Sequence, residues 1–347
     1  MKKTQKKQKM SRRELDLRKE MVVHAVHDMF EPVLHAKQAA SLGNALEGIL
    51  VAASLGIQAI GAGYALANGT NPKHASKQVD RLLSNTKISL DAIALPWFDA
   101  VLDGLHDIIV HLDWTNFDDC DHATLSLALE TGHGRSTLLL SRTYKKSALK
   151  GRQNQHEVDL LTFFAHYCEQ HDLRVTLVAD RGFDAAEFRA FLELELEFDY
   201  VIRLRSNLLL EHSGRTQKAG EWVHGSGKAR SLKDVKITGE KIPCNRVVTV
   251  RDKGMEKPWL LATSREDLKT RDVIKTYGTR FRIEESFRDL KNERFGLGLS
   301  QVKIKVARRR DMLMYLGSVG VYMLSKLGEA VQNVEGMEKR YFGCKPG

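Results

Sequence analysis

Residues 175–183 read Val175-Thr176-Leu177-Val178-Ala179-Asp180-Arg181-Gly182-Phe183, which is a short apolar run followed at once by an aspartate. A run of this length, bounded by a turn signal, predicts a buried strand. A second run, Ile108-Ile109-Val110-His111-Leu112, ends in Asp113-Trp114-Thr115 in the same way. Open α/β sheets place their sites beyond the carboxyl ends of strands, so both aspartates are predicted at one edge of a sheet.

The elements around these two runs predict the fold class. Residues 124–129 and 136–141 alternate like strands and are joined by Gly132-His133-Gly134, which is a hairpin signal. Residues 154–171 and 184–194 are predicted as helices, and residues 200–205 as a strand. The order of three strands, helix, strand, helix and strand predicts an α/β protein with a ribonuclease H-like core.

Residues 207–265 are predicted as a β-rich insertion into this core. Strand-like stretches at 235–238, 247–251 and 259–262 alternate with turns that contain glycine. The insertion holds 12 Lys or Arg and six acids, so it contributes +6 of the chain's net charge of +10. Thr263 and Ser264 stand before Glu266 and Asp267, which predicts a capping box at the start of the next helix.

Four residues after the insertion, Tyr277, Arg280, Glu284 and Lys291, are spaced so that one helix would gather them within about 60° of arc. A carboxylate flanked by two cations and a phenol suits a site where a metal ion meets a phosphate backbone. The alternative is an exposed helix with ordinary ion pairs, such as Glu284 with Arg288. Gly278 lies inside this region, and a break in the helix is plausible there.

Composition narrows the class of partner. A chain of 347 residues with 42% hydrophobic and 28% charged residues is typical of a soluble globular protein with two or three domains. The net charge of +10 favours a polyanion such as nucleic acid. The four cysteines lack the spacing of zinc ligands and predict reduced thiols in a cytosol. The uncharged stretch 48–72 is long enough for a membrane span, but Gly48, Gly56, Gly61 and Gly63 interrupt it, and no membrane partner is expected.

The N-terminal third is predicted to be helical. Residues 1–36 form a basic arm, and residues 37–95 read as short helices at about 39–55, then to 67, then 71–83. The third helix carries the candidate DNA contacts Lys73, Lys77, Gln78 and Arg81, which would suit a helix-turn-helix reader. The alternative is a small helical bundle that only packs on the core.

Asp113, Asp180 and Glu284 supply three hard oxygen ligands on separate elements. This is the set that two Mg²⁺ ions about 3.5–4 Å apart require to activate one oxygen and stabilise another. Either aspartate alone is weak evidence, because many aspartates after strands only cap a turn. Together with the spacing of the 277–291 stretch, they predict metal-dependent phosphoryl transfer on nucleic acid.

On these residues the chain resembles the bacterial insertion-sequence transposases of the DDE type, in the cut-and-paste group with the Y-R-E-K signature, the family-four type. The resemblance covers roughly residues 35–320 and rests on Asp113-Trp114-Thr115, Asp180-Arg181-Gly182-Phe183 and Ile283-Glu284-Glu285-Ser286-Phe287-Arg288-Asp289-Leu290-Lys291. It implies that Asp113, Asp180 and Glu284 bind two Mg²⁺ ions, for which Mn²⁺ can substitute. It also implies that Tyr277, Arg280 and Lys291 hold phosphates at the element's end.

The resemblance implies a role for Trp259 as well, as the tryptophan that stacks on a base flipped out of the duplex. Its alternative is a core tryptophan of the β insertion. The implied domains are the basic arm (1–36), a helical DNA-binding domain (37–95), the catalytic core (96–206 and 266–325), the insertion (207–265) and a C-terminal tail (326–347).

The implied reaction begins with a cut in one strand at the transposon end, and the freed 3′-hydroxyl then attacks the opposite strand to form a hairpin. Hairpin opening and strand transfer into target DNA follow. The implied partners are double-stranded DNA, as terminal inverted repeats and as target, and a second copy of the chain in a synaptic homodimer. The protein is expected in the bacterial cytoplasm, associated with the nucleoid.

Two other functions compete with this one. A DNA-end-binding inhibitor, catalytically silent or truncated, is favoured by the short stretch after Lys291, whereas three intact acids argue against it. A ribonuclease H-like nuclease unrelated to transposition would share the metals, but it does not account for the phosphate-binding residues or the basic insertion. Metal-dependent cleavage, compared with metal-free binding, separates these classes.

Overall fold

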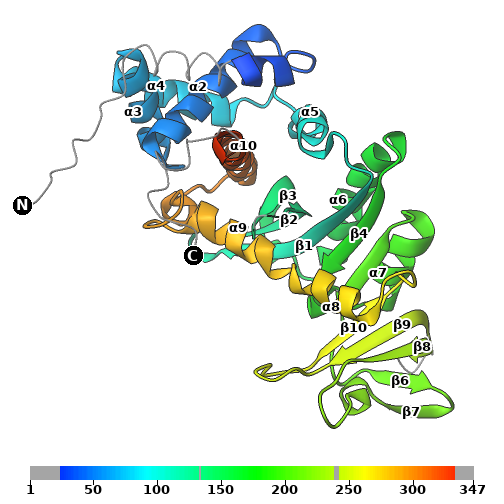
Figure 1. The fold of residues 1–347 in the computed structure, drawn as a ribbon. Coiled ribbons are helices and arrows are strands. Elements are labelled where there is room, and N and C mark those ends of the chain that lie inside the picture. Colours follow the sequence, from blue (N-terminus) through cyan, green and yellow to red (C-terminus); the bar gives the residue numbers. More distant parts are fainter. Residues whose placement is uncertain (1–23, 133, 238–241, 333–347) are drawn as a thin grey trace, which may run out of the picture. The chain divides into compact units, whose positions relative to one another are not determined.

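The computed structural model describes residues 24–132, 134–237 and 242–332 (Figure 1). The chain divides into two compact units, residues 1–101 with 290–347, and residues 102–289. Most of the predicted basic arm and the last part of the predicted tail lie outside the described residues.

The first unit is helical. The three helices predicted near its start are confirmed as α2 (Ala36–Ala52), α3 (Ile57–Asn68) and α4 (Pro72–Ser84). Gly56 precedes α3 as its N-cap, at the predicted turn. The side chain of Asn71 accepts hydrogen bonds from the backbone N–H groups of Lys73 and His74, and Pro72 occupies the first position of α4. This is the arrangement that opens a helix most favourably.

Glycines let these helices cross at very short range. A Cβ atom on Gly48 would lie 2.3 Å from the carbonyl oxygen of Ile60, and one on Gly61 would lie 2.5 Å from the backbone nitrogen of Ser76. Gly48 therefore stands where α2 meets α3, and Gly61 stands where α3 meets α4. Within the described residues no single helix is long and apolar enough to cross a membrane, although α2 and α3, bent by 93°, pass that test as a pair.

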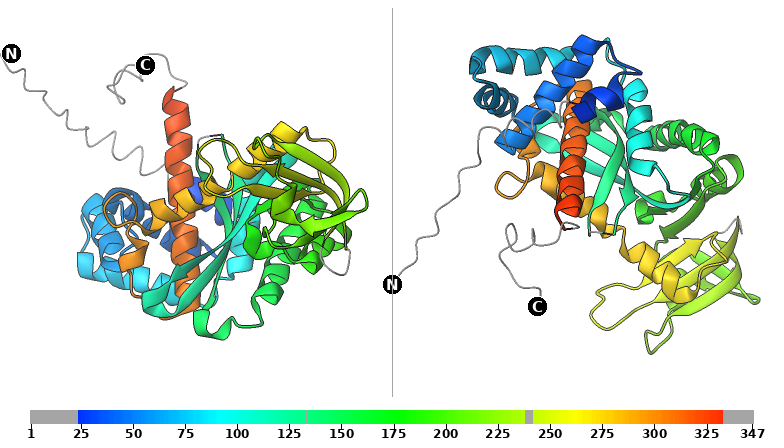
Figure 2. Two further views of the ribbon diagram at one scale, coloured as in Figure 1. Left: turned by 90° about the horizontal axis from the view of Figure 1, so that it is seen from below. Right: turned by 45° about the horizontal axis from the view of Figure 1, so that its top comes forward.

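The first unit also contains α10 (Ala307–Gln332) and, up to Val101, α5 (Leu90–Leu102). Figure 2 shows α10 as one uninterrupted helix. Its Tyr315 hydroxyl donates to the Ile93 carbonyl at 2.9 Å, and its Tyr322 hydroxyl donates to the Ala100 carbonyl at 2.7 Å. The ring of Trp97 meets both tyrosines edge-on. Aromatic packing with satisfied hydroxyls thus fixes α10 against α5.

The second unit is built on one ten-stranded sheet with the order β3-β2-β1-β4-β5-β10-β9-β8-β6-β7. β1 pairs antiparallel with β2 and parallel with β4, and β5 is parallel to β4. The strands of residues 207–265 continue this sheet, because β10 pairs antiparallel with β5. The strands are β1 (Asp107–Phe117), β2 (His122–Glu130), β3 (Ser136–Lys145), β4 (Arg174–Ala179), β5 (Asp199–Arg203), β6 (Leu209–His212), β7 (Arg215–Lys218), β8 (Arg230–Ile237), β9 (Ile242–Val250) and β10 (Trp259–Thr263).

Helices contact both faces of this sheet. Because side chains alternate along β1, Asp113 and Trp114 point to opposite faces. The indole of Trp114 meets α6 (Gln153–Gln170) through Glu157, whereas Asp113 faces Arg280, which lies between α8 (Thr270–Gly278) and α9 (Phe281–Lys291). The predicted helix at 184–194 is present as α7 (Ala186–Ala190), which continues as a wider helical turn to Glu195.

The predicted capping box is wrong. Thr263 ends β10 and donates its hydroxyl to the Tyr200 carbonyl at 2.7 Å, while the Ser264 hydroxyl donates to Asp199 at 2.9 Å. The next helix, α8, begins only at Thr270. Both hydroxyls bond to β5, a pairing between distant segments that the local pattern cannot reveal.

Residues 277–291 do not lie on one helix, and the break that the sequence makes plausible at Gly278 is present. α8 ends at Gly278 and α9 begins at Phe281, so Tyr277 stands on a different helix from Glu284. In the connection, Thr279 and Arg280 donate their N–H groups to carbonyls three residues back, at 3.1 and 3.0 Å. Glycine is a weak helix former, and the tighter 3₁₀-type bonds replace the α pattern there.

Candidate active site

Asp113 and Asp180 stand level with each other on neighbouring strands. The last paired residues of β1 and β4 are Leu112 with Ala179, and the two aspartates come next on each strand. Adjacent strands lie about 4.8 Å apart, so the aspartates are neighbours. One detail differs from the sequence analysis: β1 continues to Phe117 alongside β2, so Asp113 lies within a strand and not at its end.

Asp180 opens a tight turn over residues 181–183. Its carboxylate accepts the Gly182 N–H at 2.7 Å. A Cβ atom on residue 182 would lie 2.9 Å from the same carboxylate oxygen, so glycine suits this position. The Asp-Arg-Gly sequence therefore fixes one oxygen of Asp180 against the backbone and leaves the side chain half-buried.

Asp113 is the most perturbed carboxyl group of the site. Its side chain is 18% exposed. Burial raises the pKa of Asp113 to about 7, Asp180 and Glu284 add to the rise, and Arg280 opposes it. Asp113 is thus a poorly hydrated carboxyl group with two further acidic side chains near it, and a cation would stabilise its ionised form.

Arg280 supplies a cation at this place. One guanidinium nitrogen lies 3.6 Å from Asp113 Oδ2, and another donates to Glu284 Oε1. The Arg280 side chain is 8% exposed, and its Nε atom is buried without a hydrogen-bond partner. Its guanidinium also lies over the ring of Phe281, 4.4 Å from the centroid. Arg280 therefore bridges two of the three predicted carboxylates, while Glu284 itself is half-exposed.

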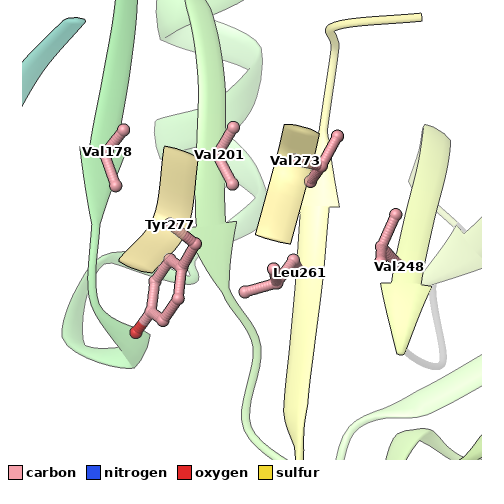
Figure 3. Packing of buried hydrophobic residues seen from close by; sticks show 6 residues of the cluster. All are labelled: Val178, Val201, Val248, Leu261, Val273 and Tyr277. Atoms are coloured by element: carbon pink, nitrogen blue, oxygen red, sulfur yellow. The ribbon is translucent and has the colours of Figure 1, made fainter. Parts of the chain in front are cut away.

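Tyr277 packs into the sheet. Its ring belongs to a buried cluster with Val178, Val201, Val248, Leu261 and Val273 (Figure 3). Burial raises the pKa of the Tyr277 phenol, which Arg280 and Arg203 oppose. Tyr277 is 1% exposed, and its phenol lies near two arginines. Its aromatic ring anchors the end of α8 on β4, β5 and β10.

Trp259 begins β10 and packs against Tyr277. The two rings meet edge-on with centroids 4.8 Å apart, and Phe281 lies 6.3 Å from Trp259 on a tilted plane. The indole is partly buried. This environment matches the packing alternative for Trp259, and the tryptophan also adjoins the α8–α9 connection.

Lys291 is the last residue of α9, about two helical turns or roughly 10 Å beyond Glu284 along the axis. It counts with the first unit, whereas the other five residues predicted around the metals and phosphates lie in the second. Those five, Asp113, Asp180, Tyr277, Arg280 and Glu284, are brought together.

The predicted DNA contacts on α4 lie in the first unit, and Lys73, Lys77, Gln78 and Arg81 are all exposed. The opposite side of α4 is buried through Ala75, Val79, Leu82 and Leu83. Gln78 and Arg81 also line a cavity of about 530 Å³ with Lys37 and Asn44 of α2. The helix thus packs through one side and offers a polar, basic side outward.

Sequence reasoning gave no role to two groups around the site. His111, two residues before Asp113, is fully buried and bonds to Ser136 and Thr279. Burial, with Arg280 and Arg282, lowers the pKa of His111 to about 3. Glu157, on the other face, accepts the Trp114 indole N–H at 2.8 Å. A polar residue inside an apolar strand was the available signal for His111, whereas Glu157 carried none.

The donor set fits a hard divalent cation in chemistry, because it consists of carboxylate oxygens that repel one another. In the described part of the chain, however, no three His, Cys, Asp or Glu side chains are close enough to share one metal ion. Arg280 takes up the space between Asp113 and Glu284. The three acidic residues therefore match a metal site in the type of their ligand atoms and in their charge, but not in their present spacing.

The chain matches a known protein family. Residues 146–319 match the family described as "Transposase DDE domain". This stretch spans half of the chain and includes Asp180, Glu284 and the whole 277–291 region. No curated protein matches the chain.

Proposed function

The chain belongs to the transposase DDE domain family, and from this premise we propose that it moves an insertion sequence by a cut-and-paste route with a hairpin intermediate. The family implies a metal-dependent enzyme that cuts DNA. The observation that carries the proposal to particular residues is the register of β1 and β4, which sets Asp113 beside Asp180, with Glu284 joined to Asp113 through Arg280.

In this proposal Asp113, Asp180 and Glu284 hold two Mg²⁺ ions, or Mn²⁺ in their place. Bound there, the ions would supply Lewis-acid activation of the attacking oxygen and stabilisation of the leaving one. Asp113 contributes a buried oxygen and Asp180 an oxygen fixed by its turn. Glu284 contributes a half-exposed carboxylate, which can reorient when its ion pair with Arg280 is broken.

Arg280 has a second role in the proposal, as a phosphate ligand together with Tyr277 and Lys291. The guanidinium, which now forms ion pairs with two carboxylates, has the planar donor geometry that phosphate oxygens need. Tyr277 acts from a fixed position, since its ring is packed into the sheet. Trp259 is proposed to stack on a flipped base beside Phe281, at the start of α9.

Sequence recognition is proposed for the helical region 37–95, through Lys73, Lys77, Gln78 and Arg81 on the outward side of α4. The strand order β3-β2-β1-β4-β5, with three antiparallel strands and two parallel ones, supports a ribonuclease H-like core over 96–206 and 266–325. Residues 207–265 then form its insertion. A synaptic homodimer, acting in the bacterial cytoplasm at the nucleoid, completes the proposal.

The test is cleavage of DNA that carries the terminal repeats flanking this gene, analysed on denaturing gels with Mg²⁺ or with EDTA. We expect nicks and hairpins at the repeat ends with Mg²⁺ alone. Glu284→Gln should abolish them and leave end binding in a mobility-shift assay nearly unchanged. Equal cleavage by this variant would remove Glu284 from the metal site, and binding without any cleavage by the wild type would favour the inhibitory alternative.

A further inference from the structure

A buried polar chain runs from β1 to the connection between α8 and α9. The His111 imidazole is fully buried, with Nδ1 2.8 Å from Ser136 Oγ and Nε2 2.9 Å from Thr279 Oγ1. Ser136 begins β3, and Thr279 is the residue between Gly278 and Arg280. One side chain therefore joins two strands of the sheet to the segment that carries Arg280.

The direction of each hydrogen bond in this chain follows from the number of available protons. The Thr279 hydroxyl donates its single proton to the Thr276 carbonyl at 2.7 Å, so toward His111 it accepts. His111 must then carry its proton on Nε2 and accept at Nδ1 from Ser136. All three groups are satisfied in this arrangement, with a neutral imidazole and one defined tautomer.

Ser136, at the other end of this series of hydrogen bonds, is bonded to α9 as well. Ser286 accepts the Ser136 N–H at 2.9 Å and donates to the Ser136 carbonyl at 2.7 Å. Ser286 lies two residues beyond Glu284 on the same helix. The connection before Arg280 and the first turns of α9 are therefore fastened to β1 and β3 at two points, one on each side of Arg280 and Glu284.

We propose that His111 and Thr279 are positioning residues, which hold the α8–α9 connection so that Arg280 and Glu284 lie over Asp113. Between the two helices, where α8 ends at Gly278, the backbone forms only 3₁₀-type bonds, so side-chain hydrogen bonds such as that of Thr279 help to fix the connection. The inference rests on the proposed function for its catalytic consequence. Its structural consequence, an ordered connection, holds for the metal-free protein too.

Thr279→Val is the direct test, because it removes the hydroxyl and keeps the shape of the side chain. Thr263→Val is the control: Thr263 is fully buried whereas Thr279 is partly buried, but the Thr263 hydroxyl likewise donates to a carbonyl at 2.7 Å and accepts an N–H at 3.0 Å, and it lies at the end of β10. Thr279→Ser keeps the hydroxyl. Single-turnover cleavage of repeat-end DNA, end binding and hydrogen exchange of the metal-free protein are measured for all three variants.

We expect Thr279→Val to lower the cleavage rate by about tenfold to a hundredfold at saturating DNA, since a small misplacement of a catalytic group has this effect. End binding should stay within about twofold. Amides of residues 279–286 should exchange at least about tenfold faster than in the wild type. Thr263→Val should show neither change, and Thr279→Ser should restore the rate. Cleavage and exchange by Thr279→Val that equal those of Thr263→Val would overturn the inference.

If Thr279→Val does not fold, His111→Gln and His111→Asn replace it. The glutamine amide reaches the place of Nε2 and keeps a donor for Thr279, whereas asparagine keeps only the acceptor side, so faster cleavage by His111→Gln is expected and equal rates would overturn the proposal. If the wild type itself does not cut DNA, the proposed function fails, and the exchange of the metal-free variants still decides the inference.

Discussion

Arg280 determines how the carboxylates of the site respond to a metal ion. Its guanidinium bridges Asp113 and Glu284, so an incoming cation competes with a resident positive charge. We expect Arg280→Gln to bind Mn²⁺ about tenfold more tightly than the wild type, because a unit charge a few Å away contributes on the order of 1–4 kcal/mol. Isothermal titration calorimetry at pH 7.5 and low salt measures this affinity.

Arg288→Gln is the control for that prediction. Arg288 lies on α9, beyond the connection that carries Arg280, and pairs with Glu285 at an exposed position. Its removal changes the net charge equally and should leave the Mn²⁺ affinity near that of the wild type. Equal or weaker Mn²⁺ binding by Arg280→Gln would mean that Arg280 does not compete with the metal.

The residues of the site could be found from sequence only where a local pattern exposes them. The two aspartates follow apolar runs, and the spacing of Arg280 and Glu284 is helical, so these were predicted. The burial of Tyr277 and the bridge formed by Arg280 depend on β4, β5 and β10 meeting α8, which no local spacing encodes. His111 was visible as a polar residue in an apolar strand, but its partners are 25 and 168 residues away.

At the scale of elements, α6 and β1 are joined by a carboxyl group whose ionisation is unfavourable. Glu157 is 7% exposed, and burial raises its pKa above the usual 4.5, against the effect of the Trp114 hydrogen bond. As pH rises through 4.5, the unfolded chain releases this proton while the folded protein keeps it, so the wild type loses stability. Glu157→Gln keeps an acceptor for Trp114 without a titrating proton.

We therefore expect the melting temperature of Glu157→Gln, relative to the wild type, to rise between pH 4.5 and pH 7. Thermal unfolding followed by circular dichroism at a series of pH values measures the difference. Glu169→Gln, an exposed change on the same helix, should give a difference that does not vary with pH in this way. A constant difference for Glu157→Gln as well would show that Glu157 ionises normally in the folded protein.

The elements themselves were largely predictable, because hydrophobic periodicity and capping residues act locally. The three N-terminal helices and strands β2 to β5 appeared within a few residues of their expected bounds, whereas β1 runs five residues past its expected end at Leu112. The capping box at Thr263 failed because its hydroxyls bond to β5, and the helix over 277–291 divided because Gly278 and Thr279 favour a tighter connection. That the insertion continues the main sheet is a matter of long-range strand pairing, which alternation alone does not specify.

At the scale of the whole molecule, the two compact units predict two separable activities. If α4 supplies phosphate contacts, each cation it contributes releases counterions on binding, and the logarithm of DNA affinity falls with the logarithm of salt concentration by about 0.9 per contact. Replacing Lys73, Lys77 and Arg81 together by alanine should therefore lower this slope by up to about three. Fluorescence anisotropy over a salt series measures it.

The same triple variant should bind Mn²⁺ as the wild type does, since the carboxylates lie in the other unit. Glu284→Gln should behave in the opposite way, with an unchanged salt slope and weaker Mn²⁺ binding. This reciprocal pattern requires that end binding and metal binding belong to different parts of the chain. An unchanged salt slope for the triple variant would mean that α4 is not part of the DNA interface and that the 37–95 helices form a bundle with a packing role only. A loss of Mn²⁺ binding by the triple variant would mean that the two units do not act separately.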